Sequence, residues 1–338
     1  MSESRYLVTG GAGFIGAHLV MSLRVRGQTV RVLDDFSTGR AANLAYALGR
    51  SFTPPSTGET VTADGVEVLH GDIRDAEACR RACAGVEVVL HQAAMRSVPR
   101  SVDDPLGSNE ANVTGTLNLL IAAAAAGVRR VVNASSSSIY GDDPTLPKRE
   151  DQLAAPVSPY AASKLAGEHY CRVFSRTYGL STVSLRYFNV FGPLQDPQSQ
   201  YAAVIPLFIG WTLAGRPLEV HGDGLQSRDF TYIDNVVAAN LLAAERPDLS
   251  GEALNVACGE RLTLLDVADT IERIVGRKVE RRHTASRRGD VRHTLADVSK
   301  ARAVLGYQPS VPFAEGMART VAFFAQQAPA SGPSGGAR

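Results

Sequence analysis

A glycine-rich turn near the start of the chain limits the possible fold more than any other feature. The stretch VTGGAGFIG places Gly10, Gly13 and Gly16 between an apolar, β-branched run and a helical pattern that we predict over residues 14–26. Glycines at this spacing allow a tight turn and let backbone N–H groups approach a pyrophosphate at the helix N-terminus. The alternative is a turn that only packs a helix on a strand. A second predicted strand, QTVRVLDDF, follows in the order that dinucleotide binding requires.

Predicted strands alternate with predicted helices through the first half of the chain. The runs VEVLHGD, VEVVLHQAA, VRRVVNASS and TVSLRYFNVFG indicate further strands, and DAEACRRACAG and NVTGTLNLLIAAAAAG indicate helices between them. This order is typical of βαβ units in a parallel sheet. We therefore predict an α/β fold, a Rossmann-type doubly wound parallel sheet with a smaller C-terminal substrate-binding domain.

The predicted domain boundaries lie where this alternation weakens. We predict a dinucleotide-binding domain over residues 1–190, with a segment near 230–260 returning to it, and a mainly substrate-binding domain over residues 191–325. Residues 51–65, SFTPPSTGETVTADG, fit no periodicity and are predicted to form a surface insertion. The tail over residues 326–338 is predicted to be disordered.

Composition argues against several classes of function. The formal net charge is +1, so no overall field attracts nucleic acid or an anionic membrane. The 4 cysteines lack metal-ligand spacing, and we expect small buried hydrophobic side chains instead. No segment approaches the ~18 apolar residues of a membrane span, and the N-terminus lacks a signal-peptide pattern. We expect a cytoplasmic protein that binds no metal, nucleic acid or membrane.

An acidic residue at the end of the second predicted strand indicates which dinucleotide is bound. Asp34 follows Gly16 by eighteen residues. A carboxylate at this place can accept both ribose hydroxyls of an adenosine and would repel a 2′-phosphate, which favours NAD over NADP. Asp35 is an alternative for the same role. In GDIRD, after the third predicted strand, Asp72 and Ile73 are candidates for contacts with the adenine.

Two further motifs carry groups suited to proton transfer. SPYAASK places Tyr160 and Lys164 four residues apart, on one face of a helix. A phenol is a poor base at neutral pH unless cations lower its pKa, as the lysine ammonium and a positive nicotinamide ring would. The serine run of NASSSSIYG lies at the carboxyl end of a predicted strand, where parallel sheets bind ligands. Ser136 or Ser137 can hydrogen-bond the oxygen that Tyr160 deprotonates; a turn-forming serine run is the alternative.

Together these motifs resemble a known family. From about Arg5 to Phe324 the chain is similar to the extended short-chain dehydrogenases/reductases, in particular the NAD-dependent nucleotide-sugar epimerases and dehydratases. The motifs that carry the resemblance are TGGAGFIG, HQAA, SSSSIYG, SPYAASK, LRYFNVFGP, SRDFTYIDNV and RGDVRHTLADVSKA. Within the family the chain looks most like UDP-sugar 4-epimerases, with SVPRSVDDP and YAAVIP closest to the subgroup that acts on UDP-N-acetylhexosamines.

The resemblance implies a redox-neutral reaction with NAD as a tightly held cofactor. In such epimerases a hydride leaves C4 for NAD⁺ and the 4-keto sugar then rotates in the site. The hydride returns to the opposite face of the same carbon. Related 4,6-dehydratases carry an Asp-Glu pair where this chain has Ser137 and Ser138, so epimerisation is favoured over dehydration. A sensor or scaffold that only binds the nucleotide is a further alternative, disfavoured because Tyr160 and Lys164 are both present.

The resemblance also implies the binding residues. Arg228 and Arg287 are candidates to clamp the pyrophosphate, with solvated surface charge as the alternative. Thr294 falls where these enzymes size the sugar pocket, and its small side chain leaves room for a large C2 substituent or for a rotated sugar with a C6 group. The remaining substrate candidates are Ser136, Ser137, Asn189, Ala203, Val204, Asp290 and Ser97. The cofactor candidates are Gly10, Gly13, Phe14, Ile15, Gly16, Asp34, Asp35, Asp72, Ile73, Ala93, Ala94, Tyr160, Lys164 and Tyr187.

One arginine departs from the pattern of the hexosamine subgroup. Arg96, in AAMRSVPRS, follows the strand expected to support the nicotinamide, and a cation there could pair with a C6 carboxylate. This favours UDP-glucuronic acid as the substrate, with UDP-galacturonic acid as the product. UDP-N-acetylglucosamine and UDP-glucose are the alternative substrates. The alternative for Arg96 itself is a side chain turned to solvent or to a phosphate.

Family membership further implies a homodimer. Such enzymes usually pair through two helices, and the segments after Asn109 and after Pro159 are the candidates here. Both segments are rich in Ala and Leu, which equally suits helices that pack on the sheet.

Overall fold

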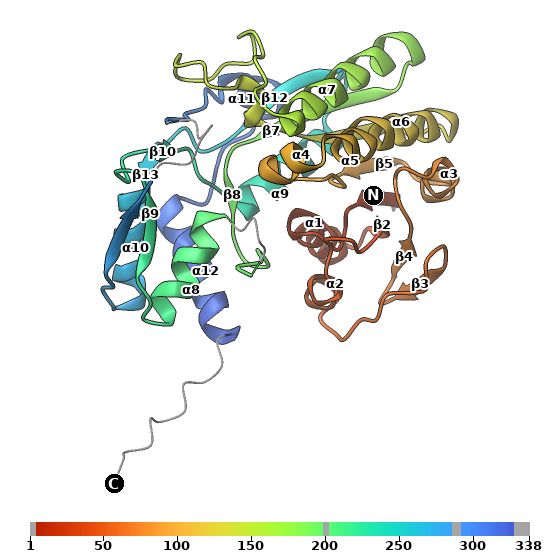
Figure 1. Cartoon of the computed structure of the whole chain (residues 1–338). Coiled ribbons are helices and arrows are strands. Elements are labelled where there is room, and N and C mark those ends of the chain that lie inside the picture. Colours follow the sequence, from red (N-terminus) through yellow and green to blue (C-terminus); the bar gives the residue numbers. More distant parts are fainter. Residues whose placement is uncertain (1–4, 199–202, 286–291, 328–338) are drawn as a thin grey trace.

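A mostly parallel sheet of eight strands forms the centre of the computed structural model, which describes residues 5–198, 203–285 and 292–327 (Figure 1). Neighbouring strands run parallel except for the pair β3 and β4. In spatial order the strands are β12 (Glu252–Val256), β7 (Ser181–Tyr187), β6 (Arg130–Ser136), β5 (Val88–His91), β1 (Arg5–Thr9), β2 (Thr29–Asp34), β4 (Val66–His70) and β3 (Thr60–Ala63). The predicted α/β class with a Rossmann-type sheet is confirmed.

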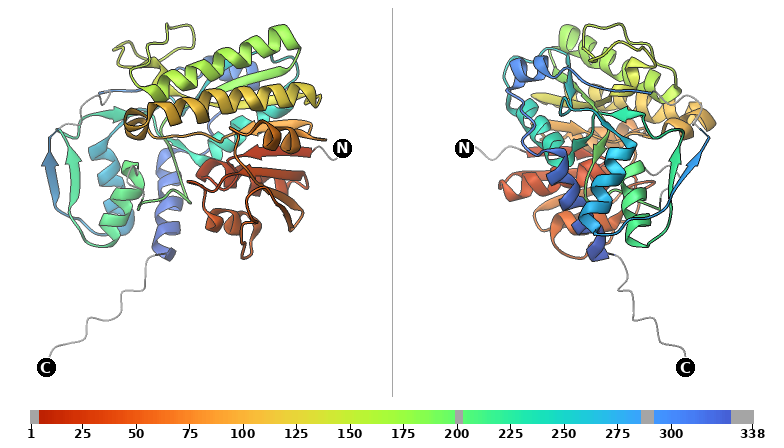
Figure 2. Two further views of the ribbon diagram at one scale, coloured as in Figure 1. Left: turned by 45° about the vertical axis from the view of Figure 1, so that its right-hand side comes forward. Right: turned by 90° about the vertical axis from the view of Figure 1, so that its left-hand side faces the viewer.

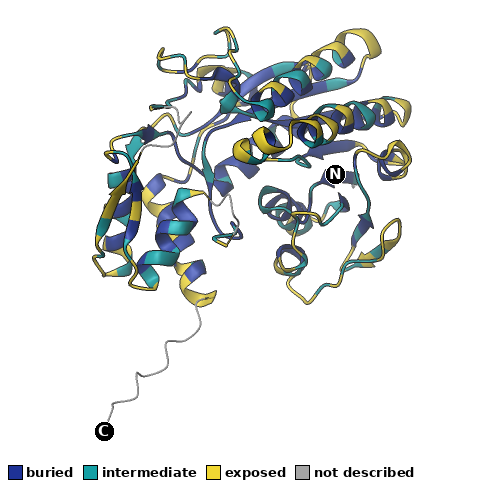
Figure 3. Cartoon of the chain, viewed as in Figure 1, coloured by how far each residue is buried: buried dark blue, intermediate teal, exposed yellow. Residues whose placement is uncertain are grey.

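Helices cover both faces of this sheet (Figure 2). On one face lie α3 (Ala76–Cys83), α4 (Val98–Asp103), α5 (Pro105–Asn109), the π-helical turn η1 (Glu110–Thr114), α6 (Gly115–Ala125) and α7 (Pro159–Tyr178). On the other lie α1 (Phe14–Val25), α2 (Ala41–Leu48), α9 (Ile233–Glu245) and α11 (Ser299–Leu305). Each face buries its own apolar cluster, so the central strands are mostly dark blue in Figure 3, while the edge strand β3 and the outer faces of the helices are largely exposed or half-buried. Burial on both faces is why the strands read as continuous apolar runs rather than alternating ones.

A smaller group of elements follows the first seven strands. It includes three helices that pack against one another: α8 (Val204–Leu213), α10 (Leu264–Val275) and α12 (Phe313–Gln327). Three two-stranded sheets accompany them: β9 (Leu218–His221) with β14 (Arg281–Thr284), β10 (Ser227–Arg228) with β13 (Leu262–Thr263), and β8 (Val190–Phe191) with β11 (Thr231–Tyr232). In the sequence, α9 and β12 lie between α8 and α10, but they pack against the large sheet instead of joining the smaller group. The residue limits of the two predicted domains stay a prediction.

Local sequence explains where the helix that carries the tyrosine motif begins and ends. The Ser158 hydroxyl caps α7 by accepting from the Ala161 N–H at 3.2 Å, and Pro159 takes the first helical position, where no N–H is needed. Gly179 ends the helix in the left-handed region at φ 70°. None of the helices in the described part of the chain is long and apolar enough to cross a membrane.

Two predictions about irregular segments were wrong in part. Within the predicted insertion 51–65, residues Thr60–Ala63 form β3 and pair antiparallel with β4 at the edge of the sheet. A four-residue edge strand that alternates exposed and half-buried positions carries too little apolar signal to be recognised from sequence. The predicted tail 326–338 begins too early, because α12 continues to Gln327; its residues 328–338 lie outside the described residues.

Candidate active site

The glycine turn has the geometry that a pyrophosphate requires. Gly10 has φ 68°, and a Cβ added there would lie 2.7 Å from the Ala93 nitrogen. A Cβ on Gly16 would lie 2.0 Å from the Gly10 oxygen, so only glycine lets α1 approach the turn this closely. Gly13 is the N-cap of α1 and has no side chain to cap the N–H groups of the first helical residues, which include Phe14 and Ile15. Uncapped N–H groups at the positive end of a helix favour a bound phosphate.

The predicted ribose ligand lies beside this turn. The Asp34 carboxylate, at the end of β2, accepts from the backbone N–H groups of Ala12 and Phe36, both at 2.8 Å. Each carboxylate oxygen keeps a further lone pair for a ribose hydroxyl. Burial raises the pKa of Asp34 to about 6, although the two backbone hydrogen bonds act to lower it. Asp35, the alternative ligand, accepts from the N–H and hydroxyl of Ser37.

The two residues predicted to contact the adenine follow β4 at the same edge of the sheet. Asp72 accepts from the backbone N–H of Arg74 at 2.8 Å, and its charge pairs with the Arg74 guanidinium. Ile73 is buried, and its carbonyl accepts from the Asn118 side chain at 3.2 Å. Both therefore lie near the carboxyl ends of the strands, where open parallel sheets bind nucleotides.

Three of the four predicted catalytic side chains, those of Ser136, Tyr160 and Lys164, meet where β6 ends and α7 begins. Lys164 donates from Nζ to the Ala134 carbonyl at 2.9 Å, and Nζ lies 6.0 Å from the centroid of the Tyr160 ring. Ser136 is the last residue of β6 and hydrogen-bonds the Tyr160 side chain. Ser137 begins the 3-10 turn η2 (Ser137–Tyr140), one residue further from the strand.

Burial dominates the electrostatics of these groups. It raises the pKa of Tyr160, whereas the hydrogen bond with Ser136 and the positive charge of Arg96 act to lower it; the net pKa stays above the ordinary value. For Lys164 burial acts in the opposite direction, because the charged form is the protonated one, and it lowers the pKa to about 8. The chain's own cations therefore do not bring the phenol into the neutral range that we predicted for a base.

An asparagine that the sequence analysis missed ties this centre together. In η1, Asn112 accepts from the Met95 N–H at 2.8 Å and donates to the Met95 carbonyl at 3.1 Å. The same amide donates to the Ser163 hydroxyl at 2.9 Å, and Ser163 in turn donates to the Tyr160 carbonyl at 2.8 Å. Asn112 thus fixes the loop that carries Arg96 relative to the tyrosine helix. A polar residue in an Ala- and Leu-rich helical pattern was its one sequence signal.

The loop after β5 contributes the other predicted residues on this side. Ala93 and Ala94 follow β5 and are half-buried, and the Ala93 N–H donates to the Thr9 hydroxyl at 3.2 Å. Arg96 is exposed, and Ser97 caps α4 by accepting from the Arg100 N–H at 3.2 Å.

Tyr187 was predicted as a cofactor contact, and its polar end is already bound within the protein. It pairs with Ser136 in the register of β6 and β7. Its hydroxyl lies within hydrogen-bond distance of Asn240, 2.9 Å from Nδ2, and of Gln92, 3.2 Å from Nε2. Only the ring of Tyr187 is left to contact a cofactor.

The predicted substrate residues converge from the smaller group of elements. Asn189, at φ 34°, donates from Nδ2 to the Asp229 carbonyl at 3.0 Å and to the Thr294 hydroxyl at 3.3 Å. Arg228 donates to the Arg292 carbonyl at 3.1 Å. Ala203 is the exposed N-cap of α8 and Val204 its first residue. Arg287 and Asp290 lie outside the described residues.

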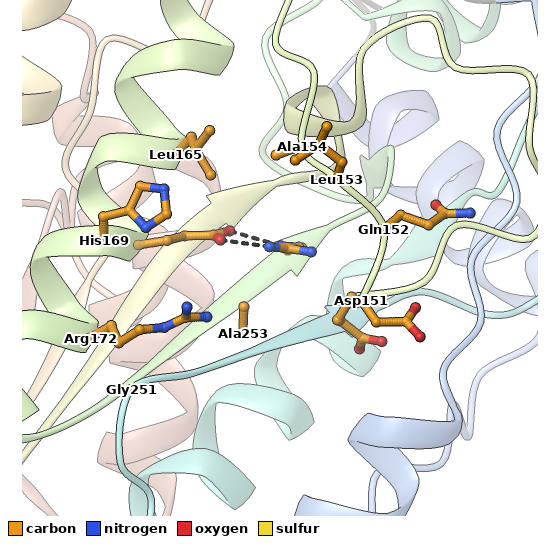
Figure 4. A pocket seen from close by; sticks show the side chains of 12 residues that line it. Asp151, Gln152, Leu153, Ala154, Leu165, His169, Arg172, Gly251 and Ala253 are labelled. Atoms are coloured by element: carbon orange, nitrogen blue, oxygen red, sulfur yellow. Dashed lines mark hydrogen bonds and ion pairs between the residues drawn. The ribbon is translucent and has the colours of Figure 1, made fainter.

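A buried ion pair lies directly behind the serine run. Arg186 donates to the Glu168 carboxylate from Nε at 2.9 Å and from Nη2 at 2.8 Å, with both side chains 7% exposed (Figure 4). Ser135 donates to the same carboxylate, and Arg186 donates to the Tyr140 hydroxyl at 2.9 Å. Burial lowers the pKa of Arg186, but Glu168 more than offsets this effect and the net pKa is raised. The pair forms part of the wall of a pocket of about 360 Å³ whose lining includes none of the predicted site residues.

Comparison with known proteins assigns the family. The model of the NAD dependent epimerase/dehydratase family matches residues 6–257. A UDP-glucose 4-epimerase of Mycolicibacterium smegmatis is 41% identical over 322 residues, which covers 95% of this chain and 98% of the relative. The chain belongs to the NAD-dependent epimerase/dehydratase family. The predicted family resemblance is confirmed.

Solved structures give the same assignment. A UDP-N-acetylglucosamine 4-epimerase of Methanobrevibacter ruminantium, in complex with UDP-N-acetylmuramic acid, matches with a TM-score of 0.87 at 36% identity and covers 97% of this chain and 100% of that chain. A UDP-glucuronic acid 4-epimerase of Bacillus cereus, in complex with UDP-glucuronic acid and NAD, matches with a TM-score of 0.84 at 31% identity, covering 96% and 99%. The protein is thus an NAD-dependent isomerase, a UDP-sugar 4-epimerase, and its relatives are named for different sugars.

Proposed function

We propose that this epimerase interconverts UDP-glucuronic acid and UDP-galacturonic acid. The observation that carries the proposal is Arg96: its guanidinium is exposed, and its charge acts on the phenol of Tyr160. Among the described residues Arg96 forms no hydrogen bond or ion pair with the protein. When the sugar's C4 hydroxyl is at Tyr160, a C6 carboxylate is two carbon atoms away and within reach of this cation. Arg pairs with carboxylates through two parallel hydrogen bonds.

The catalytic roles follow from the same arrangement. Tyr160 takes the proton from the C4 hydroxyl, and Ser136 donates a hydrogen bond to the same oxygen. NAD, when bound, would supply the chemistry of hydride transfer, accepting the hydride from C4 and giving it back to the same carbon. Lys164 holds a positive charge beside the phenol. After the 4-keto sugar has rotated to present its other face, the hydride returns to C4 and Tyr160 gives the proton back to the C4 oxygen. The sugar is therefore neither oxidised nor reduced overall.

The nucleotide part of the substrate has its own proposed contacts. Arg228 reaches the pyrophosphate, together with Arg287, and Asn189 supports the sugar diphosphate. Asp290 takes the uridine ribose, while Ala203 and Val204 line the uracil. Thr294 borders the sugar, and its small side chain accepts a ring that is rotated to bring C6 toward Arg96.

The test offers purified protein UDP-glucuronic acid, UDP-N-acetylglucosamine and UDP-glucose in separate tubes, with products resolved by NMR. We expect preferential conversion of the uronic acid. Arg96→Ala should raise KM for the uronic acid at least tenfold and change KM for a neutral sugar less than threefold, whereas Arg96→Lys keeps the charge and should restore most of the affinity. Equal effects of Arg96→Ala on both sugars, or faster conversion of the N-acetyl sugar by the unaltered protein, would make the proposed substrate wrong.

We also propose a cytoplasmic homodimer that pairs through α6 and α7. Both helices expose apolar side chains, Ile121 at 54% and Val173 at 47%. Isolated apolar residues are ordinary on surfaces, but two on neighbouring helices suit a bundle with a second copy. Light scattering of the purified protein should give twice the chain mass, and Ile121→Glu should reduce it; a monomeric unaltered protein would refute the dimer.

A further inference from the structure

The turn that carries the proposed ribose ligands adopts a conformation that needs outside support. Phe36, directly after Asp34 and Asp35, has φ 53°. This left-handed region is unfavourable for a bulky aromatic residue, so it persists only where the surroundings hold it. The Phe36 N–H donates to the Asp34 carboxylate at 2.8 Å, and this bond ties the strained residue to the ligand.

The inner side of this turn closes against the glycine turn. The Ala12 carbonyl accepts from the Arg40 N–H and from the Asn43 side chain, both at 2.9 Å. A Cβ on Gly39 would lie 2.6 Å from an Asp34 carboxylate oxygen and 2.8 Å from the Ala12 Cβ. The turn thus has no room to move inward.

The outer side of the turn packs against the segment 52–59. The Phe36 ring stacks on the Phe52 ring, with centroids 6.5 Å apart and planes 24° apart. It also meets the His70 ring edge-on, with centroids 5.1 Å apart. Aromatic pairs at these distances attract each other beyond simple area burial. Phe52 and His70 therefore hold Phe36 from outside.

His70 connects the segment to the turn through hydrogen bonds. Its Nδ1 lies 2.8 Å from the Pro55 carbonyl oxygen, and its Nε2 lies 3.3 Å from the Asp35 carbonyl oxygen. The backbone adds further ties: the Gly58 N–H donates to the His70 carbonyl at 2.8 Å, and the His70 N–H donates to the Glu59 carbonyl at 3.1 Å. The segment, the end of β4 and the turn are thus one connected unit.

We infer that segment 52–59 and His70 form a retention clamp, which keeps the Asp34–Gly39 turn closed on the adenosine end of NAD during the whole catalytic cycle. The inference rests on the proposed role of Asp34 and Asp35 as ribose ligands. In an epimerase the hydride that leaves C4 must return to C4. Release of the reduced dinucleotide between the two transfers leaves a two-electron-oxidised 4-keto sugar and an enzyme that cannot continue. Phe52 and His70 are positioning residues that act through Phe36.

The test measures how many turnovers occur before cofactor is lost. Purified holoenzyme receives a UDP-sugar that it converts, while excess lactate dehydrogenase and pyruvate oxidise any NADH that leaves the protein. We expect Phe52→Ala to release NADH at least tenfold more often per turnover, and added NAD to restore the rate. Thr53→Ala, at an exposed position of the same segment, is the matched control and should behave like the unaltered protein.

The outcomes separate the clamp from general damage and from the proposed substrate. A merely structural role for Phe52 would lower the melting temperature and the initial rate without raising NADH release, and this result would overturn the inference. Unchanged release in Phe52→Ala and in the Phe52→Ala/His70→Gln double variant would also overturn it. NADH dissociation followed by fluorescence without any sugar should show the same tenfold difference, so the clamp is tested even if the protein rejects UDP-glucuronic acid.

Discussion

Removal of Arg186 should reveal how much of the protein's stability depends on the ion pair behind the serine run. Arg186 and Glu168 are each 7% exposed, so Arg186→Met leaves a buried carboxylate whose remaining donor is Ser135. Breaking a buried pair from one side costs about 3–5 kcal/mol. This is a large fraction of the ~5–15 kcal/mol that stabilises most domains. With an m-value of about 3 kcal/mol/M, the urea midpoint should fall by about 1–2 M.

Two control variants sharpen this measurement. Arg186→Met combined with Glu168→Leu removes both charges and should recover at least half of the lost stability, because no charge is left unpaired. Arg149→Met breaks the exposed pair with Asp151, 57% and 69% exposed, and should cost less than about 1 kcal/mol. The reasoning fails if Arg186→Met costs as little as Arg149→Met, or if the double variant loses the sum of the losses measured for Arg186→Met alone and for Glu168→Leu alone. Urea unfolding followed by circular dichroism gives all four values.

Two further predictions concern the cofactor. Burial raises the pKa of Asp34 to about 6, so this carboxyl group is ionised above pH 6 and protonated below it; NAD affinity, measured by calorimetry, should fall several-fold between pH 7 and pH 5. Asp34→Asn should bind weakly at both pH values, and an unchanged pH dependence in this variant would assign the titration to another group. Gly16→Ala, whose Cβ would lie 2.0 Å from the Gly10 oxygen, should lose about 1–3 kcal/mol of stability and its NAD affinity. Gly210→Ala, in α8 with open space at its Cβ, should not destabilise the protein, and equal losses in the two variants would contradict the steric argument.

Structural features that a short stretch of sequence determines could be predicted. Features that depend on contacts between segments far apart in the sequence could not. The strand–glycine–helix order predicted the parallel sheet and the place of Gly10, because a buried parallel strand and a tight turn both have short-range signatures. The strand β3 was missed, since an edge strand needs few apolar residues. The contacts of Asn112 with Met95 and Ser163 join three segments of the chain, and no spacing pattern encodes them.

The same distinction applies to charge. Sequence spacing placed Lys164 one turn from Tyr160 and suggested that the ammonium lowers the phenol's pKa. The fold adds burial, which acts on both groups: it raises the pKa of Tyr160 despite the opposing effects of Ser136 and Arg96, and it lowers the pKa of Lys164 to about 8. Burial is a property of the whole fold and has no local sequence signature.

The raised pKa of Tyr160 suits an enzyme that must take a proton and then return it to the same oxygen. A phenol with a low pKa would be a good acid in the second half of the cycle, but its phenolate would be a weak base toward the sugar hydroxyl in the first half. Because Tyr160 is buried, its ionisation depends on positive charge nearby. Arg96 acts to lower its pKa, the Lys164 Nζ lies 6.0 Å from the centroid of its ring, and an oxidised nicotinamide would add a further positive charge. In the proposed cycle, loss of the positive charge on the nicotinamide would make Tyr160 hold its proton more tightly, which would keep the proton in the site while the 4-keto sugar rotates. The return of the hydride to C4 would restore the positive charge, so Tyr160 would again be the stronger acid and could protonate the new alkoxide. If Tyr160 has the proposed role, its burial would couple the position of the proton to that of the hydride, as a reaction without net oxidation requires.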